Sequence, residues 1–308
     1  MIRIAAPILA VALAACGPAQ SPAPVSPETT DDAPATAVEA AQPAVDSAKL
    51  ATVLAAQGEE HQARYQYRHP KETLEFFGVA PGMTVAEVLP GGGWYSQLLL
   101  PYLGSEGTLV GITYDYEMWP KFGIFSAEDI EARFSGWTTK WPEQAKSWGE
   151  GDRADVAATE FGSVPDELAD SVDVVLFVRA LHNLSRFEAD GGYLTTALAE
   201  TYKILKPGGI VGVVQHQAPD SKSDEWADGS HGYLKRDNLI TAMEAAGFEY
   251  VADSDINANP KDQPGEDDIV WRLPPTFATS RDNPELKAEM AAIGESNRMT
   301  LKFRKPAE

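Results

Sequence analysis

Residues 85–104 read VAEVLPGGGWYSQLLLPYLG. An apolar run that carries one acid, Glu87, ends in three consecutive glycines, Gly91, Gly92 and Gly93, and an apolar helical pattern follows. This order predicts a buried strand, a tight turn and a helix. Glycines let the backbone of such a turn approach a ligand closely, and the following helix begins with unpaired N–H groups. The stretch therefore predicts an α/β fold with a ligand site at the turn.

Strand and helix patterns alternate along most of the remaining chain. Strands are expected at residues 84–89, 108–114, 154–158, 172–178, 209–214, 248–256 and 298–304, and helices at residues 47–66, 71–77, 95–102, 127–134, 195–205 and 236–247. Strands that are apolar on both faces and alternate with helices indicate a buried parallel sheet with helices on both faces. The last stretch, RMTLKFR, is expected to return as an antiparallel seventh strand.

The chain begins with MIRIAAPILAVALAAC, a short basic start followed by an apolar stretch too short to span a bilayer. The ending LAAC before Gly17 resembles the lipobox of bacterial lipoprotein signal peptides. That resemblance implies cleavage before Cys16, acylation of Cys16 and an anchor in the cell envelope, facing the periplasm and sorted to the outer membrane. An ordinary signal peptide or a chance cysteine is the alternative. Cys16 is the single cysteine, so the chain forms no internal disulfide.

Residues 17–45 are rich in proline, alanine and acids, and they predict a disordered tether before a folded domain at 46–308. The formal net charge of −21 argues against nucleic acid as a partner, because a phosphate binder needs a basic face. It also argues against electrostatic docking on anionic lipid. We therefore expect membrane contact only through the N-terminal anchor.

One connection, residues 116–153, is unusually long and holds four of the seven tryptophans, Trp119, Trp137, Trp141 and Trp148. Long connections with their own aromatic residues are often lids or binding elements. A small helical insert with an aromatic core is the alternative, and the sequence leaves both open.

The turn VAEVLPGGGWYS, the LKPGG before residues 209–214, the segment VDVVLFVRALHNL and the paired C-terminal strands together resemble class I S-adenosylmethionine-dependent methyltransferases. More narrowly, residues 64–306 are similar to bacterial predicted methyltransferases, many of which carry signal or lipoprotein sequences. The resemblance implies a Rossmann-like, seven-stranded, mostly parallel sheet and S-adenosylmethionine as cofactor. It does not indicate the methyl acceptor, which is either a small molecule or a protein.

The resemblance assigns cofactor binding to Glu87, Gly91, Gly92, Gly93, Tyr95, Asp115 and Glu160. Glu87 matches the acid that orients the methionine end, while Tyr95 would pack on the cofactor and Glu160 would reach the adenine amino group. The family's first glycine falls at Leu89, and its ribose-binding acid falls at Thr113. Asp115, two residues further, would face the same way as Thr113 in a strand and take over that role; the alternative is a surface acid.

Polar residues that follow the strands at 172–178 and 209–214 are candidates for chemistry. His182 and His216 are candidate general bases, needed only if the acceptor arrives protonated. Arg179 and Asn183 are candidates for holding an acceptor, whereas an ordinary ion pair is the alternative for Arg179. His182, His216 and His231 lack the spacing of a metal site, so no metal is expected.

Two rival functions remain open. The pattern Gly91-x-Gly93-x-x-Ser96 with Asp115 downstream comes close to a dinucleotide-binding fingerprint, which would indicate an NAD(P)-dependent oxidoreductase. The KPGG before residues 209–214 and the strand pair after AAGF count against it. Alternatively, a methyltransferase fold exported from the cytoplasm, where the cofactor is made, would serve as a non-catalytic binding or scaffold protein.

Overall fold

The computed structural model describes residues 43–148 and 151–307. The predicted signal segment with Cys16, and residues 17–42 of the predicted tether, lie outside the described residues. Within the described ranges, no helix combines the length and the apolar character that crossing a membrane requires.

Seven strands form one sheet in the order β3-β2-β1-β4-β5-β7-β6. They are β1 Thr84–Val88, β2 Thr108–Thr113, β3 Asp155–Glu160, β4 Val172–Val178, β5 Leu205–His216, β6 Glu249–Ser254 and β7 Arg298–Arg304. Only β7 runs antiparallel to its neighbours, β5 and β6. The fold predicted from the sequence, a mostly parallel α/β sheet with an antiparallel last strand, is confirmed. The strand order reverses between β1 and β4, and this reversal is where such sheets bind ligands.

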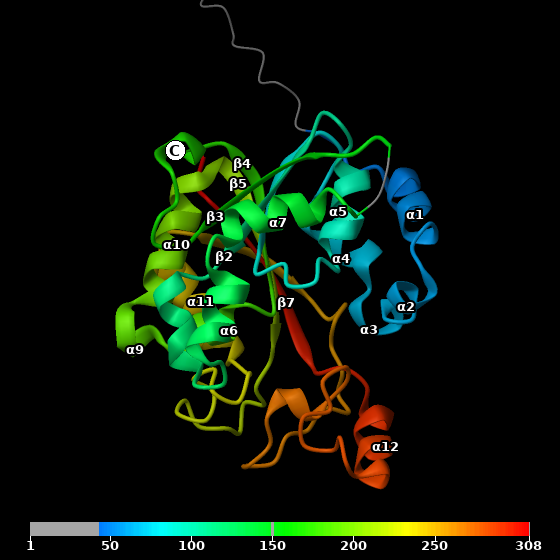
Figure 1. The fold of residues 1–308 in the computed structure, drawn as a ribbon, viewed down its shortest axis with the longest axis vertical. Coiled ribbons are helices and arrows are strands. Elements are labelled where there is room, and N and C mark those ends of the chain that lie inside the picture. Colours follow the sequence, from blue (N-terminus) through cyan, green and yellow to red (C-terminus); the bar gives the residue numbers. More distant parts are fainter. Residues whose placement is uncertain (1–42, 149–150, 308) are drawn as a thin grey trace, which may run out of the picture. The chain divides into compact units, whose positions relative to one another are not determined.

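Helices cover both faces of the sheet (Figure 1). One face carries α1 Ser47–Ala55, α4 Pro70–Phe77, α5 Ser96–Leu103 and α7 Trp137–Ala145. The other face carries η1 Tyr116–Phe122, α6 Ala127–Phe134, α8 Leu181–Arg186, α10 Tyr193–Ile204 and α11 Arg236–Ala245. Within β1, Val85 packs on the first group of helices, whereas Ala86 and Val88 pack on the second. Both faces of the central strands are therefore buried, as their continuous apolar runs require.

The helix predicted at residues 47–66 is wrong in its extent, because the chain forms three short helices there. These are α1, α2 Glu59–Gln62 and α3 Tyr65–Arg68. Gly58 interrupts the pattern with an extended backbone, φ −64° and ψ 159°, at the start of α2. The left-handed His69, with φ 38°, separates α3 from α4. These breaks orient α3 so that Arg68, together with Arg64 just before the helix, reaches the sheet edge described below.

The aromatic residues of the 116–153 connection are packed inside the domain. Trp119 stacks on Phe134 with 3.6 Å between ring centroids, and Trp137 stacks on Trp141 at 5.4 Å. Trp141 is 1% exposed and lies against Gly111 of β2. Among the described residues, this connection forms η1, α6 and α7.

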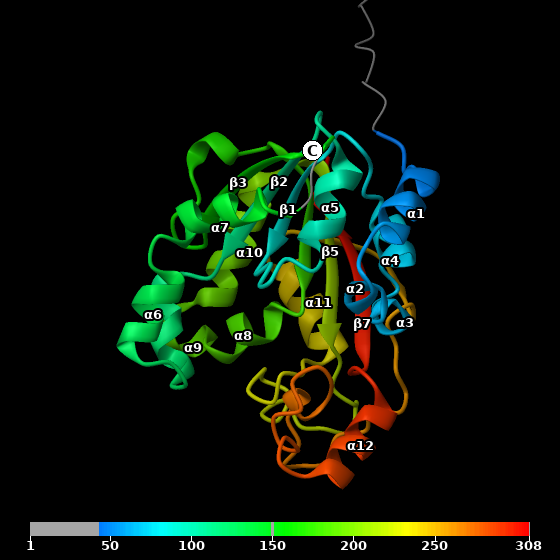
Figure 2. The same ribbon diagram turned by 45° about the vertical axis from the view of Figure 1, so that its right-hand side comes forward.

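The connection between β6 and β7, residues 255–297, folds beyond the carboxyl ends of the strands together with η3 Val270–Arg272 and α12 Pro284–Ile293 (Figure 2). A buried ion pair holds it in place, with Arg272 Nη2 2.7 Å from Asp262 Oδ1. The Tyr233 hydroxyl donates to the same carboxylate, at 3.0 Å from Oδ2. No sequence pattern indicated this element, yet it lines one side of the site described next.

The remaining short elements are α9 Glu188–Gly191 and η2 Asp166–Leu168.

Candidate functional site

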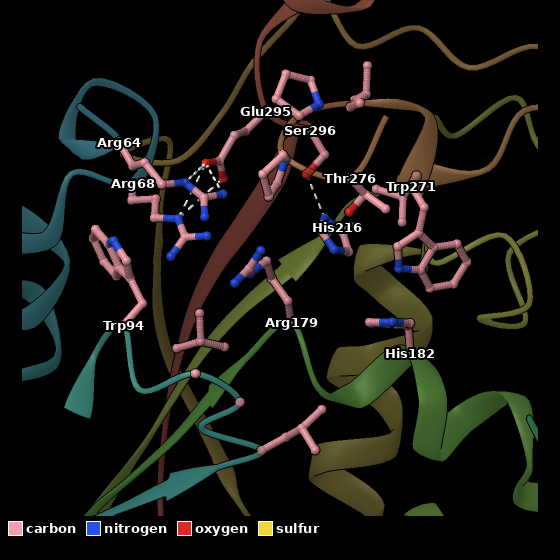
Figure 3. A pocket seen from close by; sticks show the side chains of 18 of the residues that line it. Arg64, Arg68, Trp94, Arg179, His182, His216, Trp271, Thr276, Glu295 and Ser296 are labelled. Atoms are coloured by element: carbon pink, nitrogen blue, oxygen red, sulfur yellow. Dashed lines mark hydrogen bonds and ion pairs between the residues drawn. The ribbon is translucent and has the colours of Figure 1, made fainter. Parts of the chain in front are cut away.

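A cavity of about 540 Å³ lies at the carboxyl ends of β1, β4 and β5 (Figure 3). The turn after β1 contributes Leu89, Pro90, Gly91 and Gly92, and the junction of β4 and α8 contributes Val178, Arg179, His182 and Asn183. The β6–β7 connection adds Trp271, Glu295 and Ser296 among others, and α3 and its preceding turn add Arg68 and Arg64. The volume lies in the range of pockets that take a small organic ligand.

The structure divides the predicted site residues into two groups. Those that line the cavity are Gly91, Gly92, Arg179, His182, Asn183 and His216. Those that do not are Glu87, Gly93, Tyr95, Asp115 and Glu160. The predicted residues gathered in the cavity follow β1 or β4 or, in the case of His216, end β5, because the carboxyl ends of parallel strands share one edge of a sheet.

Gly92 and Gly93 of the turn have different surroundings. A Cβ atom built on Gly92 meets nothing within 4 Å, so this residue leaves open space beside the cavity. A Cβ atom on Gly93 would stand 2.3 Å from the Trp148 ring, and Gly93 has a φ of 77°. Gly93 is therefore required for packing against the 116–153 connection, whereas Gly92 faces the site.

Glu87 and Tyr95 lie beneath the turn. The Ser96 hydroxyl donates to Glu87 Oε2 at 2.6 Å, and burial raises the pKa of Glu87 to about 7. The Tyr95 hydroxyl donates to the carbonyl of Arg68 at 3.4 Å. Both side chains are buried, at 3% and 4% exposure, and they link the glycine turn to α5 and α3.

Asp115 and Glu160 lie at the neighbouring ends of β2 and β3. Asp115 was expected to face the same way as Thr113 in a strand, but β2 ends at Thr113. Asp115 instead caps η1, where its carboxylate accepts from the Glu117 N–H at 2.8 Å. A Cβ atom on Gly162 would stand 2.8 Å from Asp115 Oδ2, so this carboxylate faces the turn after β3. Burial and then the charge of Asp115 raise the pKa of Glu160. The two acids are thus close enough to interact electrostatically, and both lie outside the cavity lining.

An arginine cluster that no sequence pattern predicted lies on one side of the cavity. Glu295 is shared by three arginines: Arg64 Nη2 lies 2.5 Å from Oε1, Arg68 Nε 3.4 Å from Oε1, and Arg298 Nη1 3.2 Å from Oε2. Burial alone would raise the pKa of Glu295, but Arg298, Arg68 and Arg64 together lower it, so it is ionised at neutral pH.

Trp94 forms the wall beside this cluster. The Arg68 guanidinium lies 4.3 Å from the Trp94 ring centroid, and His61 stacks on the same indole with 4.3 Å between centroids. These contacts fix Arg68 in place, since cation–π and stacking contacts both depend on orientation. The i, i+4 spacing of Arg64 and Arg68 was the only sequence signal available, and nothing local connects them to Glu295.

Arg179 differs from Arg64, Arg68 and Arg298 because its guanidinium makes no hydrogen bond or ion pair with any described residue. Its backbone N–H donates to Val214 of β5 at 2.7 Å, and its φ is 59°. Burial, followed by the charge of Arg298, lowers the pKa of Arg179 to about 10. It therefore remains a cation at neutral pH.

The two predicted histidines come together, with 5.5 Å between their ring centroids. His216 Nδ1 lies 2.5 Å from Ser296 Oγ. His182 Nδ1 lies 3.4 Å from Oε1 of Gln215, whose amide Nε2 donates to the Gly232 carbonyl. Because Oε1 only accepts, His182 carries its proton on Nδ1 and presents Nε2 as an acceptor. Burial lowers the pKa of His182 to about 4 and that of His216 well below its usual value, so both are neutral.

Four buried polar atoms of cavity-lining residues lack a hydrogen-bond partner in the described part of the chain. They are Arg68 Nη1, Trp94 Nε1, Arg179 Nε and Asn183 Oδ1. Buried polar groups are normally paired, so such a concentration at one cavity indicates a place for a polar ligand. In the described ranges, no group of three or more His, Cys, Asp and Glu side chains is arranged to hold a metal ion.

No protein-family model matches the chain, and no curated protein matches it. Similar solved structures include the [4+2]-cyclase SpnF, with a TM-score of 0.47 and 19% identity over 78% of this chain and 81% of that one. A SAM-dependent methyltransferase from Aquifex aeolicus has a TM-score of 0.47 and 15% identity, covering 83% and 98%. Geranyl diphosphate methyltransferase in complex with SAM has a TM-score of 0.47 and 15% identity, covering 85% and 96%. The likeness is one of fold.

Proposed function

We propose that this protein is an S-adenosylmethionine-dependent methyltransferase whose cofactor and acceptor meet in the cavity above β1 and β4. The position of the cavity carries the proposal, because it lies where the strand order reverses and the glycine turn forms part of its wall. Gly92 leaves the space that a ligand would occupy there.

The residues of the cavity fit the amino-acid end of this cofactor. Asn183 Oδ1 is a buried acceptor without a partner among the described residues, which suits an ammonium group. When bound, the cofactor supplies a methyl group on a sulfonium with a good leaving group, so the protein mainly has to align a nucleophile. His182 Nε2 is the group that would accept a proton from a hydroxyl or ammonium acceptor.

Asp115 and Glu160 remain our predictions for the ribose and the adenine amino group. Their position outside the cavity favours a second candidate function, a binding or scaffold protein that keeps the fold without its chemistry. The two candidates differ in whether the cavity binds the cofactor.

Calorimetric titration of S-adenosylmethionine and S-adenosylhomocysteine into the purified full-length protein tests the proposal. We expect micromolar binding that Gly92→Val abolishes, because Gly92 lines the cavity and the new side chain would occupy the open space beside it. Gly58→Val is the matched control, since Gly58 also has open space and a negative φ but is absent from the cavity lining. Failure of both ligands to bind the folded wild-type protein would leave the scaffold function.

We also propose that the chain is lipid-anchored at Cys16 on the periplasmic side of a bacterial envelope. The LAAC sequence before Gly17 supports this location. Metabolic labelling with a radioactive fatty acid should modify the wild-type protein and leave Cys16→Ala unlabelled. Equal labelling of both proteins, or of neither, would contradict the anchor.

A further inference from the structure

The cavity carries an excess of positive charge on a strongly acidic chain. Its charged lining residues are Arg64, Arg68 and Arg179 against the single acid Glu295, whereas the whole chain has a formal charge of −21. Both histidines of the lining are neutral. A buried excess of cations is costly unless a counter-charge is supplied.

Glu295 alone does not balance these three cations. Its two oxygens already accept from Arg64, Arg68 and Arg298. Arg298 is further occupied by the Tyr67 carbonyl, at 2.6 Å from Nη2. Arg68 retains an unpartnered Nη1, and the whole guanidinium of Arg179 remains unpaired among the described residues.

Arg179 is held where a ligand would meet it. Figure 3 shows its guanidinium between the Arg64–Arg68–Glu295 group and His216, and the charge of Arg179 helps to lower the pKa of both Arg68 and His216. The backbone of Arg179 is left-handed, a conformation that costs a non-glycine residue stability and is retained mainly at functional sites.

Resting on the proposed function, we infer that the methyl acceptor is a small organic anion whose carboxylate or phosphate is bound by Arg179 together with Arg68. Guanidinium groups match the geometry of these two anions through paired N–H donors. The anion supplies the counter-charge that the residues lining the cavity lack.

The rest of the lining suits the body of such an acceptor. Trp94 stands on the arginine side and Trp271 on the His182 side, and His182 contacts Trp271 with 5.7 Å between ring centroids (Figure 3). Val178, Val270 and Leu273 add apolar surface. An anion bound at Arg179 would thus place an apolar or aromatic body across the cavity, with a hydroxyl or amine within reach of His182.

Calorimetry on the full-length protein without cofactor tests the inference with benzoate and phenyl phosphate, and with benzamide as the neutral isostere of benzoate. We expect saturable binding of at least one anion and no comparable binding of benzamide. The two anions separate a carboxylate from a phosphate preference. Equal affinity for benzoate and benzamide, or no saturable binding of either anion up to about 10 mM, would overturn the inference.

Substitutions at Arg179 show whether the anion binds there. Arg179→Gln should weaken anion binding about 10- to 100-fold, and Arg179→Lys should recover part of the loss. Arg133→Gln removes the same charge from an exposed side chain and should leave binding unchanged. Wild-type affinity in Arg179→Gln would overturn the assignment.

The same variants separate the acceptor from the cofactor. If Arg179 binds the acceptor, Arg179→Gln should bind S-adenosylmethionine as tightly as the wild type, or more tightly because a repelling cation is gone. A loss of cofactor affinity with unchanged anion affinity would show instead that Arg179 holds the cofactor's carboxylate, and the inference would fail while the proposed function stands. Anion binding without any cofactor binding would leave an anion site and remove the proposed function.

Discussion

Leu89 and Arg179 both adopt the left-handed backbone conformation, with φ of 52° and 59°, one residue past the ends of the neighbouring strands β1 and β4. Each N–H still bonds to the strand on its outer side, Leu89 to Ile112 of β2 and Arg179 to Val214 of β5, both at 2.7 Å. The chain therefore turns sharply at the two strands where the sheet order reverses. Both residues line the cavity that opens there.

Arg179→Gly should stabilise the protein while removing its anion binding. Glycine adopts a positive φ without strain, and the substitution also removes an unpaired buried cation, so we expect a gain of about 1 kcal/mol in the free energy of unfolding. Urea denaturation measures it. Arg179→Gln keeps the strained backbone and is the matched comparison; a glycine variant less stable than the glutamine variant would contradict the prediction.

Gly93→Val and Gly92→Val should differ although the two glycines are adjacent. Gly93→Val forces a side chain into the Trp148 ring and into a positive φ, and we expect a loss of about 2–4 kcal/mol of stability. A Cβ atom at Gly92 meets nothing within 4 Å, so Gly92→Val should leave the urea midpoint nearly unchanged. Similar losses in the two variants would mean that the turn is not packed as described.

His182 should make the protein less stable as the pH falls from about 6.5 to about 4. Its pKa is lowered from 6.5 to about 4 on folding, so over this range the unfolded chain binds a proton that the folded chain does not. The stability contributed by neutral His182 is present above pH 6.5 and amounts to about 3 kcal/mol, lost towards pH 4. Unfolding curves of wild type and His182→Gln across this range measure the difference, and parallel pH profiles would contradict it.

Glu295→Gln should destabilise the protein by about 3 kcal/mol, because three arginines lose their shared carboxylate. Added phosphate should restore part of the loss by replacing the missing negative charge. Thermal unfolding in chloride and in phosphate buffers at equal ionic strength measures both effects.

Glu249→Gln provides the control for this experiment. Glu249 pairs with Arg304 at 2.7 Å, but both side chains are about half exposed, at 49% and 50%. Exposed pairs contribute about 1 kcal/mol or less. A loss in Glu249→Gln as large as in Glu295→Gln would contradict the special role of the buried carboxylate.

Local patterns predicted the elements well where one stretch of chain determines them. The strands β4 and β7 and the helix α6 have the predicted bounds, the strands because of their apolar run and alternation. For α6, Ser126 and Asp129 form a capping box that fixes its first turn. The predicted helix at 47–66 was wrong because Gly58 interrupts it, a weak local signal inside a favourable composition.

The site was predictable only in part. The topology of a parallel sheet places residues that follow β1, β4 and β5 at one edge, so the sequence located Gly92, Arg179, His182 and His216 together. It did not locate Arg64 and Glu295, which are 231 residues apart and meet only because the β6–β7 connection folds back over the sheet. Pairings of that kind leave no local pattern.

The pairing of Arg64 with Glu295 also determines when, during synthesis of the chain, the cavity can form. During synthesis the helices and strands up to β5 leave the ribosome first and can begin to pack. Trp271 and Glu295, which line the other side of the cavity, emerge later, so a nascent chain that has reached β5 holds Arg64 and Arg68 without the carboxylate that pairs with them. The cavity is therefore completed only after the β6–β7 connection has been made, just before the last strand of the sheet, β7, emerges.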